Sequence, residues 1–161
     1  MKGLVLFTLC VSLLLVGITT SQSFASSGHS HVLEWGEFGT IDPGQFNHPQ
    51  QITVDDERNI YVADTGNSRI QKFTNEGEFL SSWGTNGVKD GDLQSPVGIA
   101  IYENNVYVVD EKLHTVQKFD SDGNFILKWG GIGSEDGQFN MPKGITIDSN
   151  GIVYVADSKN Y

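Results

Sequence analysis

The stretch IYVADTGNSRIQKF at residues 60–73 decides the fold, because it occurs again at residues 106–119 as VYVVDEKLHTVQKF. A third copy begins at residues 153–161 with VYVADSKNY. In the first two copies, one apolar run is joined to a second run by a short segment that starts with aspartate. Self-similarity of this kind is the mark of a repeat architecture. The chain is therefore predicted to be built from copies of one structural unit.

Landmarks around this stretch keep nearly the same spacing in all three copies. A glycine opens each copy, and a proline follows it at a fixed offset. We place the repeats at about residues 44–84, 91–130 and 137–161. The matching landmarks are Gly44, Gly91 and Gly137; Pro49, Pro96 and Pro142; Tyr61, Tyr107 and Tyr154; and Asp64, Asp110 and Asp157.

Each complete copy contains four short β-type runs of about five residues separated by turn residues, which is typical of one β-propeller blade. Runs that are apolar at successive positions indicate sheets covered on both faces. We expect an all-β fold: a partial β-propeller of four-stranded antiparallel blades, about two and a half blades plus an N-terminal outer strand at residues 32–35. The predicted strands are 52–55, 60–63, 69–73 and 79–83; 99–102, 106–109, 115–119 and 125–129; and 145–148 and 153–156.

The repeat resembles the NHL repeat, through the pattern Pro-x-x-Ile-Thr-Val-Asp at residues 49–55 and the stretch at residues 60–73. The resemblance covers residues 32–161. It implies a propeller, most often of six blades. Propellers of this type occur in extracellular binding proteins, amidating lyases, relatives of lactonases and the substrate-binding ends of ubiquitin ligases, so the fold alone does not give the function.

The copies differ at three positions. Tyr102 stands where the other copies have Asp55 and Asp148. Thr115 stands in place of Arg69, and Gln51 in place of Gly98 and Gly144. These departures predict that some loops of the second blade differ in shape or role.

The N-terminal segment has the pattern of a helical secretory signal peptide at residues 1–25. An apolar run from Leu4 to Ile18 is followed by Ser23-Phe24-Ala25, a small-x-small cleavage pattern. A membrane anchor is the alternative, but the run is shorter than the ~20 residues that cross a bilayer. We expect cleavage after Ala25, a flexible leader at residues 26–31, a propeller at residues 32–161, and a secreted, extracellular product without membrane insertion.

The composition argues against a nucleic-acid partner. The formal net charge is −10, with 20 acidic residues against 10 lysines and arginines, and this charge repels phosphate groups. Cys10 is the only cysteine and lies within the predicted signal. The mature chain would then contain no disulfide and no RING-type zinc site.

The predicted set of strands is too small to close a ring. The outer strand at residues 32–35 lacks its expected partner, the third strand of a final blade. We therefore expect an incomplete gene product. A head-to-tail homodimer, which would cover one exposed blade face at each end, is the less favoured alternative.

Loop residues before the first strand of each blade are the candidate ligand contacts, because they vary between copies while the scaffold repeats. Neutral variation of solvated loops is the alternative. No catalytic residue, resident cofactor or metal ligand is assigned, and the nucleophile-elbow, phosphate-loop and His-Glu-x-x-His motifs are absent from the sequence. The candidates are Asn47, His48, Gln50, Gln51, Ser95, Asn140 and Lys143.

Two further sets of repeated side chains allow a structural or a functional interpretation. The repeated aspartates, which end the second strand of each copy, are expected to accept backbone N–H groups of the next turn. A ring of acids binding Ca²⁺ is the alternative. The tryptophans Trp35, Trp83 and Trp129 are expected to pack between blades, with carbohydrate stacking as the alternative.

The favoured function is an extracellular scaffold whose loop face binds a protein, peptide or glycan. The alternative is a metal-assisted lyase or hydrolase of the propeller type, amidating-lyase-like or lactonase-like. It would hold Ca²⁺ or Zn²⁺ on the channel axis of a complete propeller, with His48 as a metal ligand or proton carrier. Non-enzymatic binding is preferred.

Overall fold

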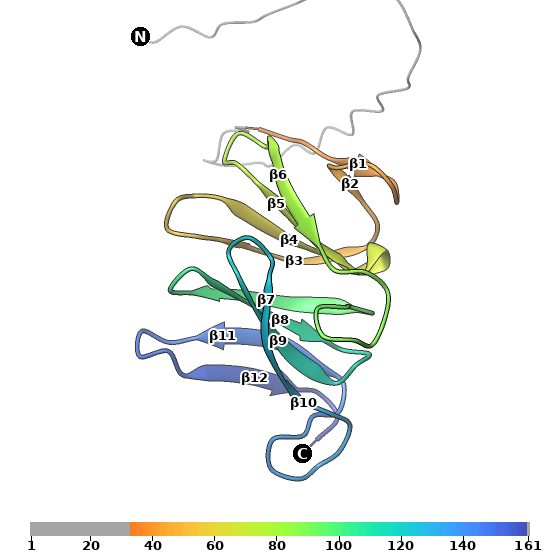
Figure 1. Ribbon diagram of the computed structural model, residues 1–161, viewed down its shortest axis with the longest axis vertical. Coiled ribbons are helices and arrows are strands. Elements are labelled where there is room, and N and C mark those ends of the chain that lie inside the picture. Colours follow the sequence, from red (N-terminus) through yellow and green to blue (C-terminus); the bar gives the residue numbers. More distant parts are fainter. Residues whose placement is uncertain (1–32, 161) are drawn as a thin grey trace, which may run out of the picture. The chain divides into compact units, whose positions relative to one another are not determined.

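The computed structural model describes residues 33–160, and these form antiparallel sheets of the kind found in propeller blades. Two of these sheets have four strands and a third has two, and a separate pair of short strands is parallel (Figure 1). The predicted all-β blade architecture is confirmed. The predicted signal peptide and leader lie outside the described residues. Within the described part of the chain, no helix has the length and apolar character needed to cross a membrane.

The strands follow the predicted repeats, but the first strand of each blade begins three residues earlier than predicted. Gln50, Gln51 and Lys143 therefore lie on first strands and not in the loops before them, because pairing with the second strand extends back to the proline. In each four-stranded sheet, strands that are consecutive in sequence are hydrogen-bonded neighbours. Blade 1 contains β3 (Pro49–Val54), β4 (Ile60–Asp64), β5 (Arg69–Phe73) and β6 (Phe79–Trp83); blade 2 contains β7 (Pro96–Tyr102), β8 (Asn105–Asp110), β9 (Thr115–Asp120) and β10 (Phe125–Gly130); blade 3 contains β11 (Pro142–Ile147) and β12 (Val153–Asp157). A single-turn 3₁₀ helix, η1 (Thr65–Asn67), joins β4 to β5.

The predicted outer strand at residues 32–35 is not formed over its described part, residues 33–35. Short β1 (Glu37–Phe38) instead pairs in parallel with β2 (Gln45–Phe46). A strand needs a hydrogen-bonded neighbour, and the expected partner strand is not among the described residues. Trp35 nevertheless packs on blade 1, with its ring 6.2 Å from that of Phe73.

The first hairpin of blade 2 explains the sequence departure at Tyr102. This hairpin turns through only Glu103 and Asn104, which both have positive φ (47° and 59°). Two such residues form the tight turn that suits the twist of antiparallel strands. Blade 1 has a longer turn, in which Asp55 accepts a hydrogen bond from the backbone N–H of Asn59. The shorter turn has no backbone N–H group in the position of Asn59, so Tyr102 can stand where blade 1 has the acceptor Asp55.

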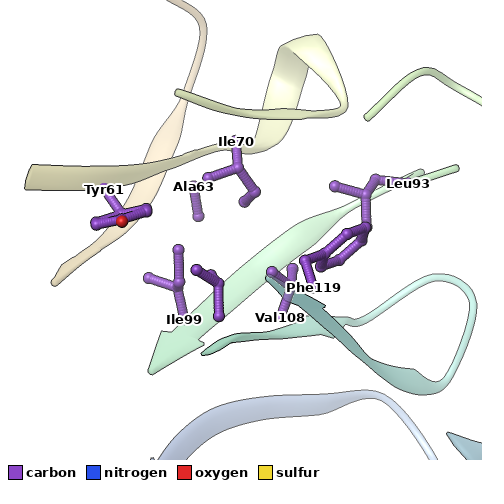
Figure 2. Packing of buried hydrophobic residues seen from close by; sticks show 8 residues of the cluster. Tyr61, Ala63, Ile70, Leu93, Ile99, Val108 and Phe119 are labelled. Carbon is purple, nitrogen blue, oxygen red and sulfur yellow. The ribbon is translucent and has the colours of Figure 1, made fainter. Parts of the chain in front are cut away.

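The blades stack through buried apolar side chains on both faces of the middle sheet. Tyr61, Ala63 and Ile70 of blade 1 face Ile99, Val108 and Phe119 of blade 2, all at or below 1% exposure (Figure 2). A second cluster joins blade 2 to blade 3 through Ala100, Tyr107, Val109, Val116 and Ile145. The first strand of each following blade lies against the first two strands of the blade before it: β7 contacts β3 and β4, and β11 contacts β7 and β8.

Tryptophan packing follows the same order. Trp83, which ends blade 1, lies 6.0 Å from the ring of Phe119 in blade 2. It also covers Gly123, where a Cβ atom would lie only 2.5 Å from the indole. Trp35 lies over Gly77 of blade 1 in the same way. These contacts support the packing interpretation for Trp35 and Trp83 over carbohydrate stacking.

We predict that Gly98→Ala destabilises the chain by about 1–3 kcal/mol, because the added methyl group would collide with the backbone carbonyl of Lys143 in blade 3. Gly144, at the same repeat position, is the matched control. A Cβ there meets only the Ala156 methyl, at 3.5 Å, so Gly144→Ala should change stability by less than about 0.5 kcal/mol. Urea unfolding of dilute protein measures both. Equal losses would contradict close packing at Gly98.

Candidate functional site

The repeated aspartates fasten the loops at one edge of the blades. Asp64 and Asp110 are fully buried. Each accepts a hydrogen bond from a residue just before the first strand of its own blade: Asn47 N to Asp64 at 2.7 Å, and Gln94 N to Asp110 at 2.7 Å. Asp157 accepts from Asn140 N at 2.8 Å. We call this edge the loop surface; it contains residues 44–48, 91–95 and 137–141 and the turns at 65–68, 111–114 and 158–160.

The groups that donate hydrogen bonds to the aspartates are thus only partly the expected backbone N–H groups of the next turn. Asp110 accepts the backbone N–H groups of Lys112 and Leu113, as predicted. Asp64 instead accepts from the side chains of Asn67 and Arg69, at 2.9 and 2.8 Å. Arg69 is replaced by Thr115 in blade 2, so backbone donors take the place of the guanidinium there.

Buried glutamines, which the sequence interpretation did not single out, complete this framework. Gln71 and Gln117 are fully buried on the third strands. Gln71 accepts from Gly44 N at 3.0 Å, and Gln117 accepts from Gly91 N at 3.0 Å. Both glycines have positive φ (79° and 86°). The sequence did contain a signal for these glutamines. Gln-Lys-Phe recurs in both copies and places a polar residue where the strand pattern predicts an apolar one.

Three of the candidate contact residues are exposed on or beside the loop surface. His48, Gln50 and Lys143 have exposed side chains. His48 lies against Asn47, with 2.5 Å between Nδ1 and the Asn47 Oδ1. Lys143 makes a 3.4 Å ion pair with Glu111 of the neighbouring blade. Such a pair between exposed groups contributes little to stability and leaves the ammonium free to bind elsewhere.

The other four candidates are half-buried. Backbone groups of Asn47, Ser95 and Asn140 bond to the repeated aspartates. The side chain of Gln51 reaches the next blade, where its Oε1 accepts a hydrogen bond from Ile99 N at 3.0 Å. These contacts give each of them a structural task besides any contact with a ligand.

The structure does not bring all seven candidates into one cavity. Gln50 and Gln51 line an open groove of about 460 Å³ beside Trp35, Phe46 and Ile52, and the other five candidates do not line it. The seven residues form a spread surface along the blade edge. A surface of this kind suits an extended partner better than a small molecule enclosed in a pocket.

Cross-blade hydrogen bonds hold neighbouring parts of the loop surface together. Ser68 Oγ donates to the Gln94 carbonyl at 3.1 Å. At the matching position of the next blade, His114 Nδ1 accepts from Met141 N at 3.0 Å. Both Ser68 and His114 have positive φ (54° and 58°). His114 was missed in the sequence because nothing marks a single histidine in a turn as a contact between blades.

Asp92 is the one group on the loop surface with a resolved pKa shift: the hydrogen bond from the Thr85 side chain lowers its pKa. The other shifted groups lie on strands or in hairpins away from the loop surface. Burial raises the pKa of Asp55, but hydrogen bonds from Asn59 and Tyr61 outweigh it and hold the pKa below 3.8. Burial, followed by the hydrogen bond to Asp55, raises the pKa of Tyr61 well above 10.0. In blade 2, the Asn124 side chain lowers the pKa of Asp120. Asp55 and Asp120 each bond within their own turn, which is a structural role.

Metal-binding geometry is not seen among residues 33–160. No group of three or more His, Cys, Asp or Glu side chains there could hold a metal ion. Asp64, Asp110 and Asp157 each bond within their own blade and do not converge on a common point.

Comparison with known folds places the chain among proteins with propeller-type blades. The structure resembles a putative exported protein from Bacteroides fragilis (TM-score 0.59, 16% identity, 80% of this chain and 36% of that one). It also resembles streptogramin B lyase (TM-score 0.53, 18% identity, 68% of this chain and 34% of that one). Identities this low show only a shared fold.

The sequence comparison identifies the repeat itself. The model of the NHL repeat matches residues 46–73 and 139–161, so the chain contains NHL repeats. Drosophila melanogaster Protein brain tumor is 41% identical over 71 residues, which are 44% of this chain and 7% of that protein. Human NHL repeat-containing protein 3 is 47% identical over 49 residues, 30% of this chain and 14% of that protein. The matches thus span a small part of these relatives.

We predict that Asp110→Ala destabilises the chain by about 3 kcal/mol, because backbone N–H groups of Gln94, Ser95, Lys112 and Leu113 lose a buried acceptor together. The comparison variant is Asp157→Ala, which removes an acceptor from Asn140 N and the Asn160 side chain at a half-buried position. It should cost about 1 kcal/mol. Thermal unfolding measures both, and an Asp110→Ala loss no larger than that of Asp157→Ala contradicts the assignment.

Proposed function

We propose that this NHL-repeat chain is an extracellular scaffold that binds a protein, peptide or glycan through its loop surface. The observation that carries the proposal is the contrast between the fixed backbone of that surface and its varied side chains. Buried Asp64 and Asp110 hold the loop backbones in place. His48 remains exposed on that surface, and Gln50 and Lys143 are exposed beside it, on the first strands of blades 1 and 3. Loops ordered before binding lose less entropy when a partner docks.

The relatives and the similar solved structures do not point to one activity. The choice between ligand binding and enzymatic activity therefore rests on the loop surface. The metal-assisted lyase or hydrolase alternative has no supporting observation in the described residues. The likeness to streptogramin B lyase is at 18% identity and extends to the fold alone. Binding is therefore the function that the geometry supports best.

Lys143→Gln should weaken ligand binding about fivefold or more, because it removes an exposed cation that lies beside the loop surface, on β11. Lys128→Gln is the matched control, since Lys128 also makes an exposed ion pair, with Asp90 at 2.7 Å, but lies on the outer strand β10. The ligand is first selected on a glycan array and from a displayed peptide library. Calorimetric titration then compares the two variants with the unchanged chain. The absence of any ligand, or equal loss in both variants, contradicts the proposal.

The extracellular part of the proposal predicts that the chain expressed in a secreting cell appears in the medium with Ser26 as its first residue. Leu14→Arg should block this export, because a charge interrupts the apolar run that the signal requires. Thr20→Arg adds the same charge beyond the run and should leave export intact. N-terminal sequencing of the secreted product and its yield provide the measurement. Retention of the unchanged chain inside the cell contradicts this part.

A further inference from the structure

The outer face of blade 1 leaves apolar side chains uncovered. Ile52 and Val54 of β3 are 57% and 55% exposed. The residues that match Ile52 in the next two blades are buried: Ile99 is 1% exposed and Ile145 is 7% exposed. Each of these pairs with the blade before it. We call the surface of β3 around Ile52 and Val54 the leading face.

The outer face of blade 3 shows the complementary pattern. Tyr154 of β12 is 52% exposed, whereas its counterparts Tyr61 and Tyr107 are 1% and 8% exposed. Ala156 is also exposed, although the matching Ala63 is fully buried. In blades 1 and 2, these positions are covered by the blade that follows. We call the surface formed by Thr146, Tyr154 and Ala156 the trailing face.

The trailing face already contains the strands that a following blade uses. At the first interface inside the chain, β7 rests on β3 and β4; at the second, β11 rests on β7 and β8. A following first strand thus makes its main contacts with the first two strands of the preceding blade. Blade 3 supplies both, as β11 and β12.

We propose that the trailing face of one copy of this chain binds the leading face of a second copy, head to tail. The contact would continue a packing mode that the chain makes twice within itself, with β3 of the second copy in the position that β7 and β11 occupy on their preceding blades. Both faces offer open apolar surface: Ile52 borders an open groove, and Gly144, Ile145, Tyr154 and Ala156 border a shallow one. Uncovered apolar surfaces of this kind mark interaction sites.

Small residues on the trailing face leave room for a strand. Gly98, the counterpart of Gly144, has no space for a Cβ because the Lys143 carbonyl of the next blade lies against it. At Gly144 the only neighbour of an added Cβ is Ala156. Gln50 holds the repeat position of Lys143. The Gln50 carbonyl of a second copy would therefore lie against Gly144.

Charge acts against this association. Each copy carries a formal net charge of −10, so two copies repel each other at long range. The contact itself is apolar, and added salt screens the repulsion. Association should therefore strengthen as the salt concentration rises, whereas a contact held by ion pairs would weaken.

The test is sedimentation equilibrium of the whole chain over a series of protein concentrations. The unchanged chain should show an average mass above that of the monomer, increasing with concentration and with salt. Ile52→Asp and Ala156→Lys, on opposite faces, should each raise the dissociation constant about tenfold or more. Gly144→Ala should also weaken association. Val88→Asp is the matched control, because Val88 is 68% exposed but lies on neither face, and it should change nothing.

Mixing the two charged variants separates a head-to-tail contact from a symmetric one. The Ile52→Asp chain keeps its trailing face and the Ala156→Lys chain keeps its leading face, so an equimolar mixture regains one intact contact and should associate more strongly than either variant alone. A symmetric contact between two leading faces would be insensitive to Ala156→Lys. A monomer at all concentrations and salt levels, or a mixture no stronger than its components, overturns the proposal. Gln50 lies at the proposed contact, but His48 does not line the groove of the leading face, so ligand binding through His48 can be measured independently of the outcome.

Discussion

The structure depends on covering each four-stranded sheet with a neighbouring sheet on both sides. Residues at successive positions of β8 point to opposite faces, and both sets are apolar and buried, Val108 toward blade 1 and Val109 toward blade 3. A sheet of this composition is not stable with one face in water. The middle blade satisfies the requirement within the chain. The leading and trailing faces carry the same type of side chain and are covered by no other blade within residues 33–160.

The packing of sheets also explains why polar groups are buried at the loop surface. Stacking of the blades partly buries the loop backbones. Their N–H groups can then no longer bond fully to water and need acceptors within the protein. Asp64 and Gln71 supply these acceptors in blade 1, and Asp110 and Gln117 in blade 2. The result is a loop backbone that is fastened at matching positions in blades 1 and 2, while the exposed side chains are free to differ. A fixed loop backbone that carries variable exposed side chains is the physical basis of the proposed binding function.

Much of the fold followed from short-range pattern. Strand positions, the blade unit and the position of the tight turns could be predicted because alternation, turn residues and repetition are local properties of a chain. The strand expected at residues 32–35 was wrong because strand formation depends on a hydrogen-bonded neighbour, which no local pattern reports. The cross-blade role of Gln51 was hidden for the same reason: its acceptor oxygen meets Ile99, a residue of the next blade.

The sequence by itself determined the repeat, the strands within each blade and the aspartates that end each second strand, since these depend on contacts between residues close in the chain. The tertiary structure alone decided which copies of a repeated residue are buried. Ile52 and Ile99 hold the same position in the repeat, yet one is 57% exposed and the other 1%. Only the presence of a preceding blade distinguishes them, because burial depends on what lies across the sheet face and not on the residue's own sequence neighbours.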